Sequence, residues 1–158
     1  MIEGVETYDM LQNGVWAVDH LVTGKPMKKV LANGCFDVLH DGHLQHLREA
    51  RAMGDYLIVS LTEDAFVNKG AGRPINHWPE RADMLRELRC VDEVITTRSS
   101  CAAIREVRPN VFVKGIDYSL GDKFTEDVAA ACREVGAELR YTAAPKQSAK
   151  EIITKAIM

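Results

Sequence analysis

Short apolar segments alternate with helical patterns along most of this 158-residue chain. The segment 56–61 is apolar at nearly every position, which is typical of a parallel strand covered on both faces. Strands that alternate in this way with helices form βαβ units with right-handed crossovers. The sequence therefore predicts an α/β fold of the Rossmann-like, doubly wound kind: a mainly parallel five-stranded sheet with helices on both faces. The expected strands are 28–33, 56–61, 92–97, 111–113 and 138–142.

Amphipathic patterns predict the helices between these strands. Pro79 suits the first turn of a helix, Ser99 or Ser100 suits an N-cap, and Gly54 and Gly136 suit helix ends. We expect a domain over 28–158, preceded by an N-terminal cap or interface segment over 1–27. The expected helices are 42–53, one that begins at Pro79, a short one from Ser99 or Ser100 to near Arg108, 124–135 and 148–156.

Composition limits the classes of partner. The net charge is −3 and the pI about 6.0, so no basic field indicates binding to nucleic acid. No apolar run approaches the roughly 20 residues of a membrane span, and the N-terminus lacks a secretory signal pattern. We therefore expect a cytoplasmic protein without a membrane partner. The four cysteines are scattered, with no C-x-x-C pair, which argues against a disulfide framework or a thiolate zinc site.

The segment between Asn33 and His43 carries the main functional signal. The strand 28–33 ends there in a turn, and His40 and His43 follow in a His-x-Gly-His pattern before the next helix. A helix N-terminus has unpaired N–H groups and the positive end of the dipole, so it attracts phosphate. Gly42 lets the backbone approach an anion closely. The sequence predicts a phosphate site here.

Two later blocks extend this signal. They are Lys69-Gly70-Ala71-Gly72-Arg73-Pro74-Ile75-Asn76 with Glu80-Arg81, and Val113-Lys114-Gly115-Ile116-Asp117-Tyr118. In order, the three blocks cover about residues 28 to 158. Together they resemble the cytidylyltransferase-like nucleotidyltransferases. Among bacterial members they look like the heptose-1-phosphate adenylyltransferases and the glycerol-3-phosphate cytidylyltransferases.

The resemblance implies roles for individual residues. His40 and His43 would contact the triphosphate and stabilise the transition state, and Lys69 and Arg81 would contact phosphates. From the residues alone, we expect Phe36 to pack in the core and Asp37 to cap or orient the turn. The nucleotide-binding set implied by the resemblance is Asn33, Gly34, Cys35, Phe36, Gly42, Lys114, Gly115, Asp117 and Ser148.

The implied reaction is transfer of a nucleoside monophosphate from a nucleoside triphosphate, with Mg²⁺, to a small sugar or polyol phosphate. Pyrophosphate is released. The second and third blocks favour ATP and a heptose-1-phosphate adenylyltransferase-like enzyme. A glycerol-3-phosphate cytidylyltransferase-like enzyme that uses CTP is the alternative. The resemblance also implies a homodimer.

Two features support other hypotheses. Relatives carry a run of hydroxyl residues at the start of the final helix, whereas this chain has Ser148-Ala149-Lys150, which favours a nucleotide-binding module without turnover. His40, His43 and His46 are spaced H-x₂-H-x₂-H, as in some metal sites. No carboxylate or cysteine completes a ligand set, so we expect His46 on the helix surface.

Overall fold

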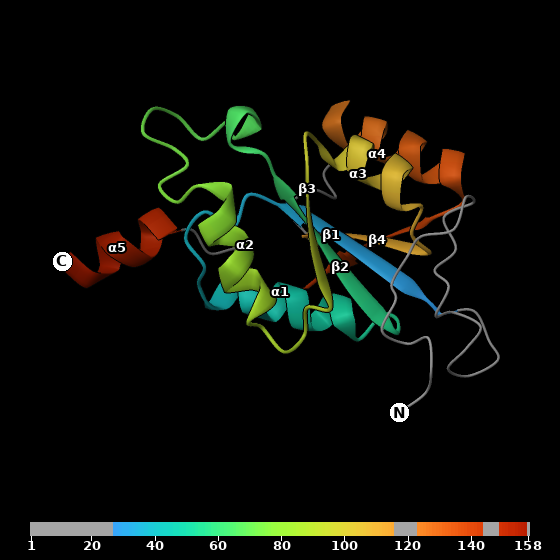
Figure 1. The fold of residues 1–158 in the computed structure, drawn as a ribbon, viewed down its shortest axis with the longest axis horizontal. Helices are drawn as coiled ribbons and strands as arrows, with labels where there is room; N and C mark the ends of the chain where they lie inside the picture. The colour runs from blue at the N-terminus through green and yellow to red at the C-terminus, as the bar shows by residue number, and fades with distance from the viewer. Residues whose placement is uncertain (1–26, 116–122, 144–148, 158) are drawn as a thin grey trace.

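The computed structural model describes residues 27–115, 123–143 and 149–157 (Figure 1). Strands and helices alternate along the chain, as the sequence predicts. The predicted strand 111–113 extends two residues further, and the predicted helix 42–53 begins one residue earlier and ends two residues earlier. The elements are β1 (Lys29–Gly34), α1 (Asp41–Arg51), β2 (Tyr56–Thr62), the 3₁₀ helix η2 (Asp64–Phe66), α2 (Trp78–Arg86), β3 (Glu93–Thr97), α3 (Ser100–Val107), β4 (Val111–Gly115), α4 (Lys123–Val135), β5 (Glu138–Thr142) and α5 (Ala149–Ile157).

The five strands form one parallel sheet in the order β3-β2-β1-β4-β5. The first described strand, β1, is central; β2 and β3 follow on one side of it, and β4 and β5 lie on its other side. The strand order therefore reverses between β1 and β4. In sheets of this kind, ligands bind beyond the carboxyl ends of the strands at such a switch point. The predicted fold class is confirmed.

Each face of the sheet packs against two helices (Figure 1). On one face, Leu47 and Ala50 of α1 and Leu85 of α2 pack against the sheet. On the other face, α3 and α4 do the same through residues such as Ile104 and Val128. All seven residues of β2 are buried, which explains its nearly continuous apolar pattern.

The helix termini follow local signals in the sequence. The Ser99 side chain caps α3 by accepting a 3.1 Å hydrogen bond from the backbone N–H of Ala102. Helix α3 ends at Val107, and Arg108, its C-cap, has a left-handed backbone conformation before Pro109. Among the described residues, no helix combines the length and apolar character that crossing a bilayer demands.

Candidate active site at the start of helix α1

His40 and His43 lie together where helix α1 begins. His40 has an extended backbone at the N-cap position, and its side chain makes no capping hydrogen bond. The two imidazole rings stack, with centroids 3.7 Å apart and planes inclined by 22°. The edge of the Phe36 ring meets His43 at a centroid distance of 5.2 Å. Because this helix follows the central strand, the pair lies at the carboxyl edge of the sheet.

The surroundings of both imidazoles favour their uncharged form. Burial lowers the pKa of His43 from 6.5 to about 3, and repulsion from Lys69 and from the protonated forms of His40 and His46 adds to this effect. Burial and the charge of Lys69 also lower the pKa of His40. Within the described part of the chain, the Nδ1 atom of each ring is buried and has no hydrogen-bond partner. Buried polar atoms are nearly always paired, so these two atoms indicate a place for a ligand.

Phe36 and Gly34 shape the turn between β1 and the histidines. Phe36 has a φ of +47°, a left-handed conformation that bulky residues rarely adopt. Its ring folds back over Gly34, where a Cβ atom would lie 2.8 Å from Phe36 Cε2. The turn therefore requires glycine at position 34. Phe36 is 5% exposed and joins the core, as the sequence predicts.

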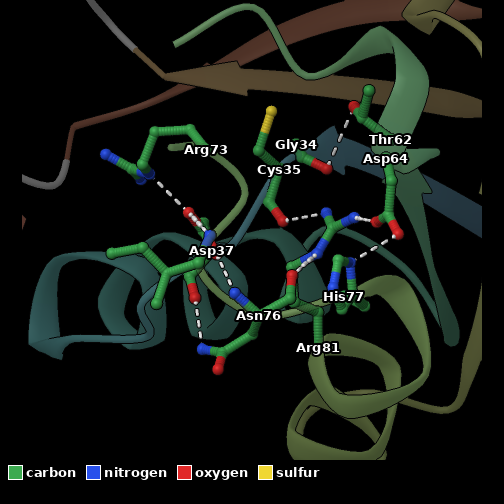
Figure 2. A network of polar contacts seen from close by, with 10 residues as sticks. Gly34, Cys35, Asp37, Thr62, Asp64, Arg73, Asn76, His77 and Arg81 are labelled. Atoms are coloured by element: carbon green, nitrogen blue, oxygen red, sulfur yellow. Dashed lines mark hydrogen bonds and ion pairs between the residues drawn. The ribbon is translucent and has the colours of Figure 1, made fainter. Parts of the chain in front are cut away.

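The carboxylate of Asp37 ties this turn to the loop that precedes α2 (Figure 2). It accepts hydrogen bonds from Arg73 Nε and from the backbone N–H groups of Ile75 and Asn76, at 2.8 and 2.9 Å for the last two. Asn76 Nδ2 donates in turn to the Asp37 carbonyl at 2.9 Å. Burial raises the pKa of Asp37, but these donors outweigh burial and lower the pKa overall. Asp37 thus orients the turn by holding a second segment against it.

Arg81 makes a second link between the same segments (Figure 2). Its side chain is fully buried. It donates to the Asn76 carbonyl at 2.9 Å and to the Cys35 carbonyl at 2.8 Å, and it pairs with the Asp64 carboxylate. The sequence predicts that Arg81 contacts a phosphate, whereas the structure turns its guanidinium to partners within the chain. This geometry favours a positioning role, which we propose below.

Lys69 stands in an exposed loop between these two links. Its ammonium is close enough to the histidines to lower the pKa of both. Gly70 and Gly72 have φ values of +99° and +78°, and a Cβ atom at either position would meet nothing within 4 Å. The loop therefore extends into open space. The contacts of Asp64 and Arg73 anchor its two ends. This leaves Lys69 able to reach a ligand beside His40 and His43.

Lys114 and Asn33 meet at the same edge of the sheet through Ser100, which the sequence indicates only as a possible helix cap. Lys114 Nζ donates to Ser100 Oγ at 3.2 Å, and Ser100 Oγ donates to Asn33 Oδ1 at 2.8 Å. Asn33 Nδ2 donates to Ser60 Oγ at 2.9 Å. Lys114 is 7% exposed, so its charge lies inside the domain. Sequence reasoning missed Ser60, and the signal that could have found it is a serine inside a nearly continuous apolar run.

The other predicted site residues fall into two groups. Gly42 lies in the first turn of α1, Gly115 ends β4, and Cys35 follows β1 with its carbonyl bonded to Arg81. Asp117, Ser148 and nearly all of the predicted N-terminal segment lie outside the described residues.

The expected surface position of His46 is wrong. The side chain is half-buried, and its Nδ1 lies 2.6 Å from Thr142 Oγ1 of β5. The helix face that carries His46 meets the sheet edge, a relationship that only the strand order reveals. Within the described ranges, no group of three or more histidine, cysteine, aspartate or glutamate residues is placed to hold a metal ion. The three-histidine metal hypothesis therefore lacks a ligand set there.

Comparison with known proteins decides the family. A sequence model described as cytidylyltransferase-like matches residues 31–157, which is most of the chain. The chain belongs to the cytidylyltransferase-like family. The predicted family and its nucleotidyltransferase class are therefore confirmed, whereas the roles of the site residues stay predictions.

Curated relatives of this cytidylyltransferase-like chain include the bifunctional protein HldE from two bacteria. The HldE of Pseudomonas fluorescens (strain Pf0-1) is 45% identical over 108 residues, which are 66% of this chain and 23% of that protein. The HldE of Ectopseudomonas mendocina is 39% identical over 134 residues, 82% of this chain and 28% of that protein. The chain thus spans about a quarter of the length of the curated relatives it matches.

Solved structures agree with the cytidylyltransferase-like fold. The lipopolysaccharide core biosynthesis protein from Thermoplasma volcanium has a TM-score of 0.65 and 27% identity, over 76% of this chain and 99% of that chain. The pantoate-beta-alanine ligase from Francisella tularensis has a TM-score of 0.53 and 15% identity, over 77% of this chain and 60% of that chain. The second likeness shows the fold alone.

Proposed function

We propose that this protein transfers adenylate from ATP to a small sugar phosphate of the heptose-1-phosphate class and releases pyrophosphate. The observation that carries the proposal is the pair of stacked, uncharged imidazoles of His40 and His43, whose buried Nδ1 atoms have no partner among the described residues. They lie at a helix N-terminus on the carboxyl edge of the central strand, where phosphate is expected. The resemblance of the Lys69 and Val113 blocks to the heptose-1-phosphate adenylyltransferases supports the choice of acceptor and base.

The chemistry requires charge neutralisation more than proton removal. An oxygen of the acceptor phosphate attacks the α-phosphorus, the new P–O bond forms, and the bond from the α-phosphorus to the bridging oxygen breaks to expel pyrophosphate. The nucleophile is already an anion, so the site must hold two anions in line and stabilise developing negative charge. Imidazole N–H groups, the first-turn amides of α1 and the Lys69 ammonium are the donors that suit this task.

We propose that Mg²⁺ enters as part of the nucleotide substrate. In the described part of the chain no metal-ligand cluster exists, and the Asp37 carboxylate is occupied by Arg73, Ile75 and Asn76. Mg²⁺ commonly binds through substrate phosphates and water, with one or two carboxylates at most. The ion would screen the triphosphate charge, while the histidines and Lys69 orient the reacting phosphate.

Arg81 and Asp37 are positioning residues in this proposal. They hold the turn after β1 and the loop before α2 together. The two segments therefore keep a fixed position relative to each other beside the histidines. Lys114 and Asn33 form the floor, with the amide of Asn33 fixed by Ser100 and Ser60. A homodimer, a cytoplasmic location and the absence of a nucleic-acid partner stay predictions from the sequence.

The deciding experiment measures pyrophosphate release with Mg²⁺ while ATP, CTP, GTP and UTP are crossed with heptose 1-phosphate, glycerol 3-phosphate and other sugar phosphates. We expect release with ATP and heptose 1-phosphate. Release with CTP and glycerol 3-phosphate alone would support the alternative enzyme. Nucleotide binding without release from any pair would favour the module without turnover.

A further inference from the structure

We propose that His46 and Glu49 are positioning residues that fix the rotation of helix α1 against the end of strand β5, and with it the orientation of the His43 imidazole. The role in turnover rests on the proposed function, but the orientation of His43 does not. We name the two contacts that His46 and Glu49 make with β5 and the residue after it the α1–β5 clasp.

The clasp consists of two hydrogen bonds between neighbouring pairs of residues. His46 Nδ1 lies 2.6 Å from Thr142 Oγ1, and Thr142 is 1% exposed. One helical turn later, Glu49 Oε2 accepts a 2.8 Å hydrogen bond from the backbone N–H of Ala143. Residues 46 and 49 share one face of α1, and residues 142 and 143 are consecutive. Two contacts in register define an orientation, which one contact would not.

The clasp adds a directional restraint to helix α1. The fully buried residues of the helix are Leu47 and Ala50, and an ion pair between Arg51 and Asp92 acts at its last turn. Apolar burial is non-directional, so polar contacts define the rotation of the helix more sharply than Leu47 and Ala50 do. At its start, the His40 side chain makes no capping hydrogen bond. Among the described contacts, the clasp supplies the polar restraint on the side of α1 that meets β5.

The clasp acts on His43 because of helix periodicity. His43 precedes His46 by three residues, so the two side chains lie on the same face of the helix. Side-chain tips lie about 5–6 Å from a helix axis, and a rotation of about 20° therefore moves them by about 2 Å. A misplacement of about 1 Å in a catalytic group can reduce a rate about 100-fold. A loosened clasp would thus change catalysis without touching the substrate.

The charges around His46 are consistent with an uncharged ring in the clasp. Burial lowers the pKa of His46, the Glu49 carboxylate raises it and Lys114 lowers it, and the net direction is downward. An uncharged imidazole has one donor and one acceptor nitrogen. The Thr142 hydroxyl is able to accept a hydrogen bond from Nδ1 in one tautomer and to donate one to Nδ1 in the other. Asparagine places an amide near the position of Nδ1, whereas leucine has a similar size and no polar atom. This pair of substitutions separates the hydrogen bond from packing.

The kinetic test compares kcat and KM for pyrophosphate release by the full chain. We expect His46→Leu to lower kcat about 10-fold with KM for the nucleotide changed less than about threefold, and His46→Asn to restore kcat to within about threefold. Thr142→Val should reproduce His46→Leu, and the double variant should lose no more than either single variant. Gln45→Ala, which removes only a contact with Asp41 on the same helix, is the matched control.

A second readout does not depend on turnover. Long-range ¹H–¹⁵N spectra report the ring nitrogens of His43, and we expect His46→Leu and Thr142→Val to shift them while His46→Asn and Gln45→Ala do not. If His46→Leu does not fold, Glu49→Leu and Glu49→Gln provide the same comparison, since glutamine keeps the acceptor for Ala143. Wild-type kcat and unshifted His43 signals in the leucine variants would overturn the proposal. If no substrate pair releases pyrophosphate, the proposed function is wrong. The spectra of His43 alone would then test the clasp.

Discussion

The guanidinium of Arg81 donates a 2.8 Å hydrogen bond to the backbone carbonyl of Cys35, 46 residues earlier in the chain. This bond joins the first turns of α2 to the end of the central strand. The same guanidinium pairs with Asp64, so a fully buried charge is compensated where three segments meet. Arg81 thus holds the segment before α2 against the turn that leads to the histidines.

Replacing Arg81 by methionine should destabilise the domain. The change leaves two carbonyl groups without their partner and the Asp64 carboxylate with His77 alone, and loss of one member of a buried pair costs about 3–5 kcal/mol. Asp64 is about one-third exposed, so solvent screening reduces this to about 2–4 kcal/mol. Urea denaturation of Arg81→Met, with the exposed Arg86→Met as control, measures the effect. Unchanged stability together with a steep rise in KM for the nucleotide would instead indicate direct phosphate contact.

His43 should make the stability of the protein fall as the pH falls. Its pKa is about 3 in the folded protein and near 6.5 in the unfolded chain, so between these values the unfolded chain binds the extra proton. The contribution is fully present above pH 6.5 and is lost progressively toward pH 3. From pH 7 to pH 4.5 we expect His43→Gln to lose about 1–2 kcal/mol less than wild type. Urea denaturation of both proteins at the two pH values tests this difference. Equal losses of unfolding free energy in the variant and in wild type would contradict it.

Removing either imidazole of the stacked pair should lower activity far more than stability. We expect His40→Ala and His43→Ala to lower kcat about 100-fold or more, because each removes a donor to the reacting phosphate. Stability at pH 7 should change much less than activity, since neither Nδ1 atom has a partner to lose among the described residues. Steady-state kinetics and thermal unfolding of the same samples measure both. The exposed His77→Ala serves as control, and full turnover in His43→Ala would refute the mechanism.

Gly34→Ala should destabilise the turn that carries the site. The added Cβ atom would lie 2.8 Å from Phe36 Cε2, and overpacking of this kind costs about 1–3 kcal/mol. Phe36→Leu in the same chain should recover part of the loss, which a double-mutant cycle by urea denaturation would reveal as coupling. Gly72→Ala is the comparison, because there a Cβ atom meets nothing within 4 Å and only the positive φ opposes it. Equal losses at both glycines would argue against the clash.

The sequence predicted those parts of the fold and site that depend on local order. The apolar run of β2 and the glycine stops made the alternating elements visible. His40 and His43 are three residues apart at a helix start, so their proximity follows from helix geometry alone. The partners of Arg81 and His46 could not be predicted. Cys35, Asp64 and Thr142 lie on segments that only the fold brings near these two side chains. A buried arginine and a phosphate-binding arginine have the same local sequence.

The contacts of Asp37 have a consequence for how the molecule opens. Ile75 and Asn76 belong to no helix or strand, yet their amide protons are held by a carboxylate with no exposed surface. Exchange of those protons with solvent requires Asp37 to move, and Asp37 directly follows the turn beside the central strand. We expect both amides to exchange nearly as slowly as those of β1, far more slowly than the amides at Gly70 and Gly72. We therefore expect a stretch without helix or strand to unfold together with the centre of the sheet.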